Sequence, residues 1–439
     1  MKNEFTLCVK RFFQINRTLK MSKLTTAILP NLRRNLLKIN HLSNRSNGSY
    51  YSQISNNAAK ENKILDYLRA KIEATGPISV ADYMKEALIS PCSGYYMSRD
   101  VFGTSGDFIT SPEISQIFGE LIGIWYFNEW SRIGQPQPLQ LVEFGPGRGT
   151  LTDDILRVFS KLTSPSQYKL SVHFIEVSPH LRQVQMSRLC PENLNESSYD
   201  KSFITKYGFP ITWHPHLTTV PEAFSLYLAH EFFDAMPIHK FQKTQDGWRE
   251  ILIDFKDNEL RYIISRNPTA ASKVLIDEKE ERDHIEVSPE SGILLESILK
   301  RIEEDGGIAL IADYGHMGTK TDTFRAFKEH KLHDPLKNPG EVDLTADVDF
   351  KYFSELAKNK AVVVGPVSQA SFLKNMGADI RLEKLMQFAD AANQKSLKTG
   401  YEMLTSPDQM GERFKFLALY PTILEDFLTK YPPAGFDQT

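Results

Sequence analysis

The stretch Leu139-Gln-Leu-Val-Glu-Phe-Gly-Pro-Gly-Arg-Gly-Thr150 runs from an apolar segment into three closely spaced glycines. A second apolar segment, Ser171-Val-His-Phe-Ile-Glu176, follows it and closes on a carboxylate. A strand, a glycine-rich turn, a helix and a second strand that ends in an acid are typical of the nucleoside-binding half of a doubly wound α/β fold. The sequence therefore predicts two parallel strands, over residues 139–144 and 171–176, beside a nucleoside-containing ligand.

Gly145, Gly147 and Gly149 are predicted to form the cofactor loop, because glycine permits positive φ angles and lets a ligand approach the backbone. Glu176 is predicted to accept hydrogen bonds from both hydroxyls of a ribose. Dinucleotide-binding loops usually read G-x-G-x-x-G/A, whereas Thr150 stands at the position of the third glycine here. The alternative is that the glycines form a plain turn between a strand and a helix.

Glu143 lies two residues before the first glycine and places a negative charge where the pyrophosphate of a dinucleotide would lie. This charge disfavours NAD and favours a ligand that carries an ammonium group. S-adenosylmethionine contains an adenosine and an ammonium group but no phosphate. The sequence therefore predicts S-adenosylmethionine as the cofactor, with Glu143 among the residues that bind it.

A third apolar segment, residues 224–229, ends in His230-Glu-Phe-Phe-Asp-Ala-Met-Pro237. Glu231 and Asp234 would share a face if this turn is helical, at the carboxyl end of a central strand where ligands bind. Two close carboxylates can pair with an arginine guanidinium, whose pKa stays above about 12, and one of them can accept its proton. We predict that Glu231 and Asp234 are catalytic; the alternative is that they only stabilise a helix start.

Residues 90–110 form a long run rich in glycine, serine and aromatic residues, which ends at Ser111-Pro112. A serine followed by proline predicts that Ser111 caps a helix. Because long irregular loops in compact proteins are usually functional, we predict a lid in which Asp107 or Thr110 reaches the methionine part of the cofactor. The alternative is a packed structural loop.

Other polar clusters do not predict a metal site. His330 and His333 have a ligand-like spacing, but no further histidine or cysteine cluster completes it. Asp343, Asp347 and Asp349 lack the glycine and the terminal glutamate of a calcium loop. We therefore expect these aspartates to cap helices or to face solvent, and we predict no metal cofactor.

The length of 439 residues predicts either one large α/β domain with additions or two domains. No stretch approaches the ~18 consecutive apolar residues of a membrane span, so stable membrane insertion is not expected. The expected fold class is α/β, a Rossmann-like and mostly parallel sheet. A helical N-terminal cap with the lid loop is predicted over residues 60–135, and the core over 136–435. Within that core, an antiparallel β insertion at 238–288 is expected beside the main sheet.

The N-terminal segment 1–59 carries a net charge of +9, which leaves −12 for residues 60–439 out of the total of −3. A basic segment that is nearly free of acids and rich in serine, threonine and asparagine predicts a mitochondrial transit peptide. The alternatives are a basic tail that binds nucleic acid and a translation start at Met21. The acidic remainder argues against a nucleic-acid substrate and is compatible with a basic peptide.

Several longer motifs occur together in this chain: Ser93-Gly-Tyr-Tyr-Met, Thr104 to Glu120, Val142 to Leu151, Phe174 to Pro179, Glu231 to Pro237, Asp313-Tyr-Gly-His316, His333-Asp and Asp343 to Phe350. Over roughly residues 60–430 this combination resembles the MidA family of mitochondrial methyltransferases. The resemblance implies a class I S-adenosylmethionine-dependent fold in the mitochondrial matrix. It also implies symmetric dimethylation of an arginine in the 49 kDa-type subunit of respiratory complex I during assembly.

Three hypotheses follow from the sequence. The first is an S-adenosylmethionine-dependent protein arginine methyltransferase. The second is an assembly factor that binds its client and a cofactor without turnover. The third is a nicotinamide-dependent oxidoreductase, which Glu143 and the missing third glycine disfavour. The sequence yields no prediction of the oligomeric state.

Overall fold

The computed structural model describes residues 62–91, 93–97, 110–163, 169–191, 201–277 and 279–436. These residues belong to one compact unit, Asn62–Thr439. The predicted transit peptide, Asp107 and most of the predicted lid loop lie outside the described residues. Within the described ranges, no helix has both the length and the apolar character needed to cross a bilayer.

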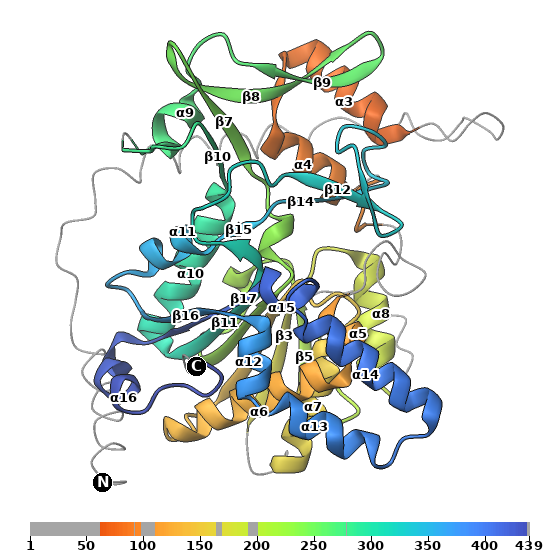
Figure 1. The fold of residues 1–439 in the computed structure, drawn as a ribbon, viewed down its shortest axis with the longest axis vertical. Helices are drawn as coiled ribbons and strands as arrows, with labels where there is room; N and C mark the ends of the chain where they lie inside the picture. The colour runs from red at the N-terminus through yellow and green to blue at the C-terminus, as the bar shows by residue number, and fades with distance from the viewer. Residues whose placement is uncertain are drawn as a thin grey trace. The chain divides into compact units, whose positions relative to one another are not determined.

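A mostly parallel sheet forms the centre of this unit (Figure 1). Its strands, in spatial order, are β16 (Val362–Ser368), β17 (Phe414–Tyr420), β11 (Gly307–His316), β6 (Phe224–His230), β2 (Leu139–Phe144), β3 (Leu170–Ile175), β5 (Pro210–His214) and β4 (Ser202–Ile204), while β15 (Val348–Asp349) pairs with the end of β11. Strands β5, β3, β2, β6 and β11 are parallel, whereas β17 is antiparallel to both of its neighbours. The expected α/β fold class is confirmed.

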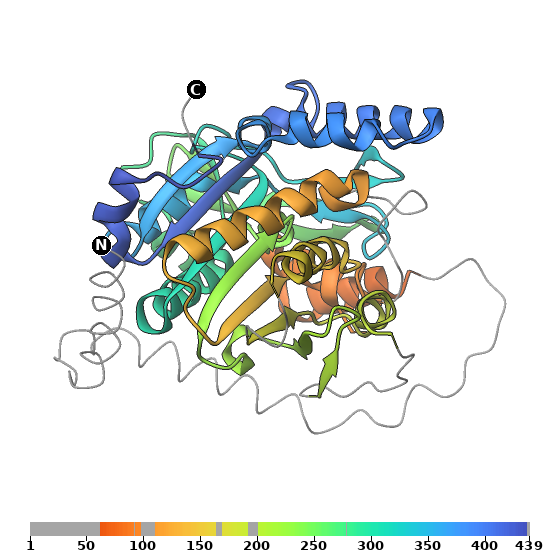
Figure 2. The same cartoon turned by 90° about the horizontal axis from the view of Figure 1, so that it is seen from below.

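Strand β2 lies where the strand order reverses, because β3 follows it on one side and β6 lies on the other. Every residue of β2, β6 and β11 is buried, as expected for parallel strands that are covered on both faces. Figure 2 shows helices on both faces. The helices α6 (Gln116–Arg132), α7 (Thr150–Leu162) and α12 (Gln369–Asn375) cover one face, and α10 (Pro289–Asp305) and α11 (Phe350–Ala357) cover the other.

The remaining elements of this part of the chain are α5 (Ser111–Ile114), α8 (Pro179–Leu189), α13 (Ala378–Met386), α14 (Ala391–Thr405), α15 (Met410–Arg413), α16 (Glu425–Lys430) and the 3₁₀ turns η1 (Leu217–Thr219), η2 (Phe233–Ala235) and η3 (Thr422–Leu424). One local prediction needs correction. Thr110 rather than Ser111 occupies the N-cap position of helix α5, and its side chain makes no capping hydrogen bond. Strand β16 contains an irregularity, because its register against β17 shifts between Val364 and Val367.

A second part of the unit, which we call the upper lobe, lies above the main sheet in Figure 1. It contains α3 (Lys63–Thr75), α4 (Val80–Ile89), α9 (Ala270–Leu275), β1 (Ile78–Ser79), β7 (His239–Thr244), β8 (Gly247–Lys256), β9 (Glu259–Ile264), β10 (His284–Val287), β12 (Arg325–Lys328), β13 (Lys331–His333) and β14 (Asp343–Thr345). The expected antiparallel insertion is present, but β7 to β10 form a separate sheet with β1 instead of extending the main sheet.

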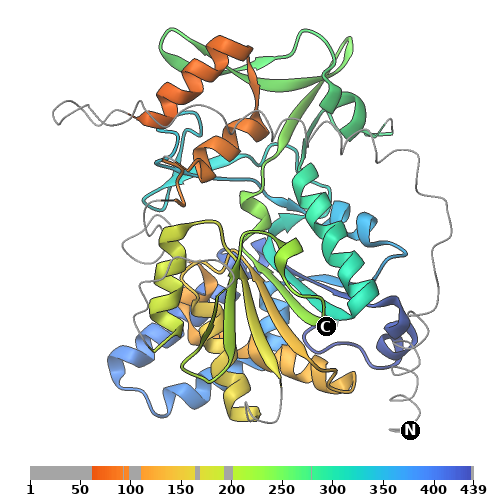
Figure 3. The same cartoon turned by 180° about the vertical axis from the view of Figure 1, so that it is seen from behind.

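The upper lobe has a hydrophobic core of its own. Tyr83, Met84 and Leu88 of α4 are buried against Ile253 of β8 and Leu344 of β14. Figure 3 shows α3 and α4 lying beside the strands of the insertion. The N-terminal helices, the insertion and the segment around β14 therefore fold together, although they are far apart in the sequence.

Candidate active site

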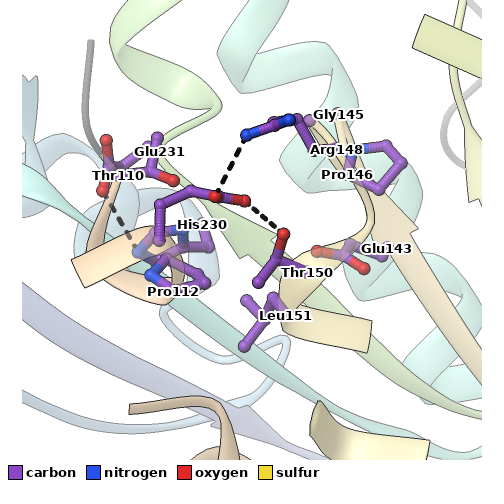
Figure 4. Close-up of a pocket in the computed structure, with 12 residues that line it drawn as sticks. Thr110, Pro112, Glu143, Gly145, Pro146, Arg148, Thr150, Leu151, His230 and Glu231 are labelled. Carbon is purple, nitrogen blue, oxygen red and sulfur yellow. Dashed lines mark hydrogen bonds and ion pairs between the residues drawn. The ribbon is translucent and has the colours of Figure 1, made fainter. Parts of the chain in front are cut away.

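A cleft of about 630 Å³ lies between the carboxyl ends of the main-sheet strands and the upper lobe. The main sheet and the turns that follow its strands contribute Phe144, Gly145, Gly147, Ile175, Glu176, Glu231, Phe232 and Asp234, and the upper lobe with its connecting segments contributes Met84, Leu88, Tyr95, Tyr96 and Asp343. The cleft is at the reversal point of the strand order, where doubly wound folds bind their ligands. A smaller cavity of about 40 Å³ shares Thr110, Gly145, Gly147 and Glu231 with the cleft (Figure 4).

The three glycines of the predicted loop all have positive φ angles, +56° at Gly145, +52° at Gly147 and +77° at Gly149. A Cβ atom on Gly145 would lie 2.8 Å from the ring of Phe232. Gly147 lines both cavities. The positive φ angles would strain any other residue at these three positions, and at Gly145 a side chain would also collide with Phe232.

Glu176 directly follows β3 and lines the cleft, and it is 6% exposed. Its Oε1 accepts a hydrogen bond from the Ser178 N–H at 2.8 Å, and its Oε2 accepts one from Gln185 Nε2 at 3.0 Å. The same Gln185 nitrogen donates to the Gly147 carbonyl at 2.7 Å. Gln185 thus joins the glycine loop to the predicted ribose acid. The sequence could have indicated Gln185, because it is a polar residue between Leu181 and Leu189 on the buried face of α8.

Glu143 is 3% exposed and lines the smaller cavity. Its Oε2 accepts a hydrogen bond from the Thr152 hydroxyl. Burial raises the pKa of Glu143 to about 7, and burial raises the pKa of Glu176 to about 7 as well. A cationic ligand near either carboxylate would favour the charged form and lower these pKa values.

Glu113 on α5 was not singled out from the sequence, yet it holds the glycine loop. The Thr150 hydroxyl donates to Glu113 Oε1, and Arg148 Nη1 lies 3.4 Å from Glu113 Oε2. Thr110, which precedes α5, lines both cavities in the region where the sequence predicts a cofactor contact. For Asp107 the structure offers no position, because it lies outside the described residues.

Glu231 has a backbone φ of +48°, which is rare for a residue other than glycine. Its N–H donates to the Ala312 carbonyl at 3.0 Å, and its Oε1 accepts from the Ser111 N–H at 3.1 Å. The side chain is 6% exposed, and burial raises the pKa of Glu231 to about 8. Backbone strain of this kind persists where surrounding contacts enforce it, often at functional sites.

The turn after Glu231 differs from the helical turn that the sequence suggested. Only residues 233–235 form a short 3₁₀ turn. Asp313 determines this geometry, because its Oδ2 accepts from the N–H groups of Phe232, Phe233 and Asp234 at 3.1, 3.0 and 3.3 Å. A carboxylate on the neighbouring strand therefore accepts hydrogen bonds from the N–H groups that the start of a turn leaves without a partner.

Asp234 lies beside Glu231 in the cleft and is 6% exposed. Its Oδ2 accepts from the Tyr314 hydroxyl and, at 2.9 Å, from Thr345 Oγ1. Its Oδ1 is buried and accepts no hydrogen bond from the residues that the structure describes. Burial raises the pKa of Asp234 above its usual value. The arrangement fixes the carboxyl group and leaves one oxygen available for a ligand donor.

Asp343 contradicts the expectation that it caps a helix or faces solvent. It is 5% exposed, lines the cleft and accepts a hydrogen bond from the Tyr96 hydroxyl at 2.7 Å. Asp347 is also buried, and it pairs with Arg325 at 2.7 Å. Asp349 does cap a helix, α11, as expected. Besides Glu176, Glu231 and Asp234, the cleft therefore contains a further buried carboxylate that local sequence did not identify.

The residues present fit S-adenosylmethionine. Gly147 lines both cavities with backbone alone, Glu176 is a buried acceptor directly after β3, and Glu143 is a buried carboxylate two residues before the first glycine of the loop. The family comparison agrees, because residues 121–367 match the model of a family described as putative S-adenosyl-L-methionine-dependent methyltransferase. The fold and the site thus define a methyltransferase of the S-adenosylmethionine-dependent class.

Similar proteins narrow the family further. The chain is 50% identical over 389 residues to a Xenopus tropicalis protein named protein arginine methyltransferase NDUFAF7, mitochondrial, which covers 86% of this chain and 90% of that protein. It is 50% identical over 391 residues to the human protein of the same name, with 85% and 87% covered. The chain belongs to the same family as these NDUFAF7 proteins.

A solved structure supports the fold. A likely methyl transferase from Burkholderia thailandensis, bound to S-adenosyl-homocysteine, has a TM-score of 0.66 and 22% identity to this chain. The match covers 88% of this chain and 97% of the bacterial one. The likeness therefore supports the fold over most of this chain.

Proposed function

We propose that this protein is an S-adenosylmethionine-dependent protein arginine methyltransferase. The observation that carries the proposal is that three buried carboxylates, Glu231, Asp234 and Asp343, line the same cleft as the glycine loop and Glu176. A guanidinium is the protein side chain whose planar, permanently charged donors suit several carboxylates at once. The names of the similar proteins support the same activity.

In this proposal Gly145, Gly147, Gly149, Glu143 and Glu176 hold the cofactor, with Thr110 and Asp107 at its methionine end. Bound S-adenosylmethionine supplies an electrophilic methyl group. The chain's own task is to position a nitrogen of the arginine and to remove its proton.

Glu231 is the proposed general base, because its pKa of about 8 lies near neutral pH, where proton transfer is most effective. Asp234 is held by Tyr314 and Thr345 and is proposed to accept a hydrogen bond from the guanidinium through Oδ1. Asp343 approaches from the upper lobe and supplies a further negative charge. Together the three acids would hold the guanidinium so that one nitrogen faces the methyl donor.

We further propose that the substrate is an arginine of the 49 kDa-type subunit of complex I, that it is dimethylated symmetrically, and that the reaction occurs in the mitochondrial matrix. The sequence motifs that resemble the MidA family support the client. The basic segment 1–59, with its net charge of +9, and the word mitochondrial in the relatives' names support the compartment. The net negative charge of residues 60–439 suits a client segment that is basic.

Mass spectrometry of complex I subunits tests this proposal. Cells that lack the protein should lose one symmetrically dimethylated arginine, and the wild-type chain should restore it. Glu231→Gln should restore neither the modification nor complex I assembly. Full assembly with Glu231→Gln and no methylation would establish instead that the protein acts as a binding factor. Tight binding of NAD and none of S-adenosylmethionine, measured by calorimetry, would contradict the cofactor assignment.

A further inference from the structure

The cleft extends beyond the acids and the glycine loop, between α4 and α10. Met84, Leu88 and Ile89 line it from α4, and Ile293 and Leu294 line it from α10. Met236, which follows η2, lines the same region. These two helices come from the upper lobe and from the main sheet's covering layer, so apolar side chains of both parts line the cleft that contains the acids.

Two of these side chains are large, apolar and open to solvent. Ile89 is 38% exposed and Ile293 is 65% exposed. Single exposed apolar residues are ordinary on protein surfaces, but here both line the same cleft from facing helices. Contiguous apolar surface at a cleft marks a place where a ligand covers it.

The charges of the cleft are divided between its floor and its walls. Glu231, Asp234 and Asp343 are buried on the floor. On the two helices, Lys85 and Glu290 also line the cleft, and they pair with each other, with Lys85 Nζ 3.3 Å from Glu290 Oε1. The floor therefore holds three carboxyl groups that a cationic side chain would ionise, while the charges of the walls neutralise one another.

We infer that the substrate segment carries apolar residues directly before and after its arginine. The inference rests on the proposed function and names the kind of sequence that this cleft selects. The arginine reaches carboxylates that are more than nine-tenths buried, so the adjoining residues are drawn down between α4 and α10. Apolar neighbours then cover Ile89 and Ile293, whereas charged neighbours meet no free counter-charge on these walls.

Peptides with a single central arginine provide the test. One peptide has leucine and valine on both sides of the arginine, and a second has serine and asparagine. We expect at least tenfold tighter binding of the first peptide, measured by fluorescence anisotropy with S-adenosyl-homocysteine present, and a matching difference in kcat/KM. The double variant Ile89→Gln, Ile293→Gln should reduce this preference to about threefold or less, mainly through KM.

Ile380→Gln is the matched control, because Ile380 is 61% exposed on α13 and does not line the cleft. It should keep the full preference. Equal binding of both peptides by the wild type, or an unchanged preference in the double variant, would overturn the inference while leaving arginine methylation intact. Weaker S-adenosylmethionine binding by the double variant would assign these walls to the cofactor instead. A preference in binding without methylation of either peptide would count against the proposed function alone.

Discussion

Glu231 combines two features that each oppose folding. Its φ of +48° is a strained conformation for a glutamate, of a kind that costs roughly 1–3 kcal/mol. Its carboxyl group is buried, which raises its pKa to about 8. Hydrogen bonds from Ser111 and to Ala312 hold it in place. Such a residue is expected where a protein gives up stability for a reactive group.

The first prediction concerns this residue. Glu231→Gln should lower the rate of methyl transfer at least about 100-fold, because an amide cannot accept the proton of the guanidinium. The affinity for S-adenosylmethionine should remain within about twofold, since glutamine keeps the oxygen that accepts from Ser111. Single-turnover methylation and calorimetry measure the two quantities.

Glu250→Gln serves as the control for removing a buried carboxylate. Glu250 is 3% exposed and bonds to His239 in the upper lobe, and it does not line the cleft. Methylation by this variant should continue at the wild-type rate once folding is confirmed by circular dichroism. Undiminished methylation by Glu231→Gln would remove Glu231 from the mechanism.

At the scale of elements, the glycine loop is held from two sides. Gln185 of α8 donates to the Gly147 carbonyl, and Glu113 of α5 accepts from Thr150 and contacts Arg148. Helix α7 begins at Thr150, directly after the left-handed Gly149. The loop is therefore preorganised, and its shape depends on helices that precede and follow it in the chain.

The second prediction is that Gly147→Val abolishes cofactor binding. Gly147 has a φ of +52° and lines both cavities, so valine both strains the loop and fills the space beside it. The dissociation constant for S-adenosylmethionine should rise at least about 100-fold in calorimetry.

Gly134→Val isolates the backbone effect. Gly134 has a φ of +95°, and nothing lies within 4 Å of a Cβ built there. This variant should lose stability to a similar degree but bind S-adenosylmethionine normally. Equal losses of cofactor affinity in both variants would show that strain, not occupation of the site, is the cause.

At the scale of the whole molecule, the cleft exists because two separately packed cores meet around it. The main sheet contributes Glu176, Glu231 and Asp234, and the upper lobe contributes Tyr96 and Asp343. Removal of either part would leave an incomplete set of acids. The upper lobe is thus part of the proposed substrate site rather than only a cover for it.

The third prediction is that the ligand-free protein loses stability as the pH rises from 6.5 to 8.5. Burial raises the pKa values of Glu143 and Glu176 to about 7 and that of Glu231 to about 8. In this range the folded protein still binds protons that the unfolded chain has released, so stability falls with pH. The total is of the order of 3 kcal/mol, or roughly 5 °C in Tm.

Two buried histidines oppose this change only at the low end of the range. Burial lowers the pKa values of His173 and His230 to about 3, so both are neutral in the folded protein, whereas their ordinary pKa of about 6.5 leaves them partly protonated in the unfolded chain near pH 6.5. Loss of these protons from the unfolded chain raises stability by less than about 1 kcal/mol in total, so the net change remains a loss. Scanning calorimetry at several pH values measures the effect, and Glu231→Gln should remove more than half of it. A Tm that stays constant or rises over this interval would contradict the prediction.

The sequence predicted the parts of the site that lie close together along the chain. Strand β2, the glycine loop and the acid after β3 follow from short-range patterns of apolar residues, glycine and charge, and β2 occurs at the predicted residues 139–144. The acids at 231 and 234 were found because they directly follow a recognisable strand. The sequence analysis did not identify β17, although this strand lies inside the main sheet between β16 and β11.

The rest of the site depends on contacts between distant residues. Asp234 is held by Tyr314 and Thr345, which lie 80 and 111 positions away, and Tyr96 bonds to Asp343 across 247 positions. Whether an aspartate caps a helix, faces water or lines a cleft depends on which strands pack around it. The residues next to it in the sequence do not determine that packing. The amino-acid sequence by itself therefore determined the fold class, the glycine loop and the strand-end acids. Only the tertiary structure decided that Asp343 joins Glu231 and Asp234, because that encounter requires the upper lobe to close over the main sheet.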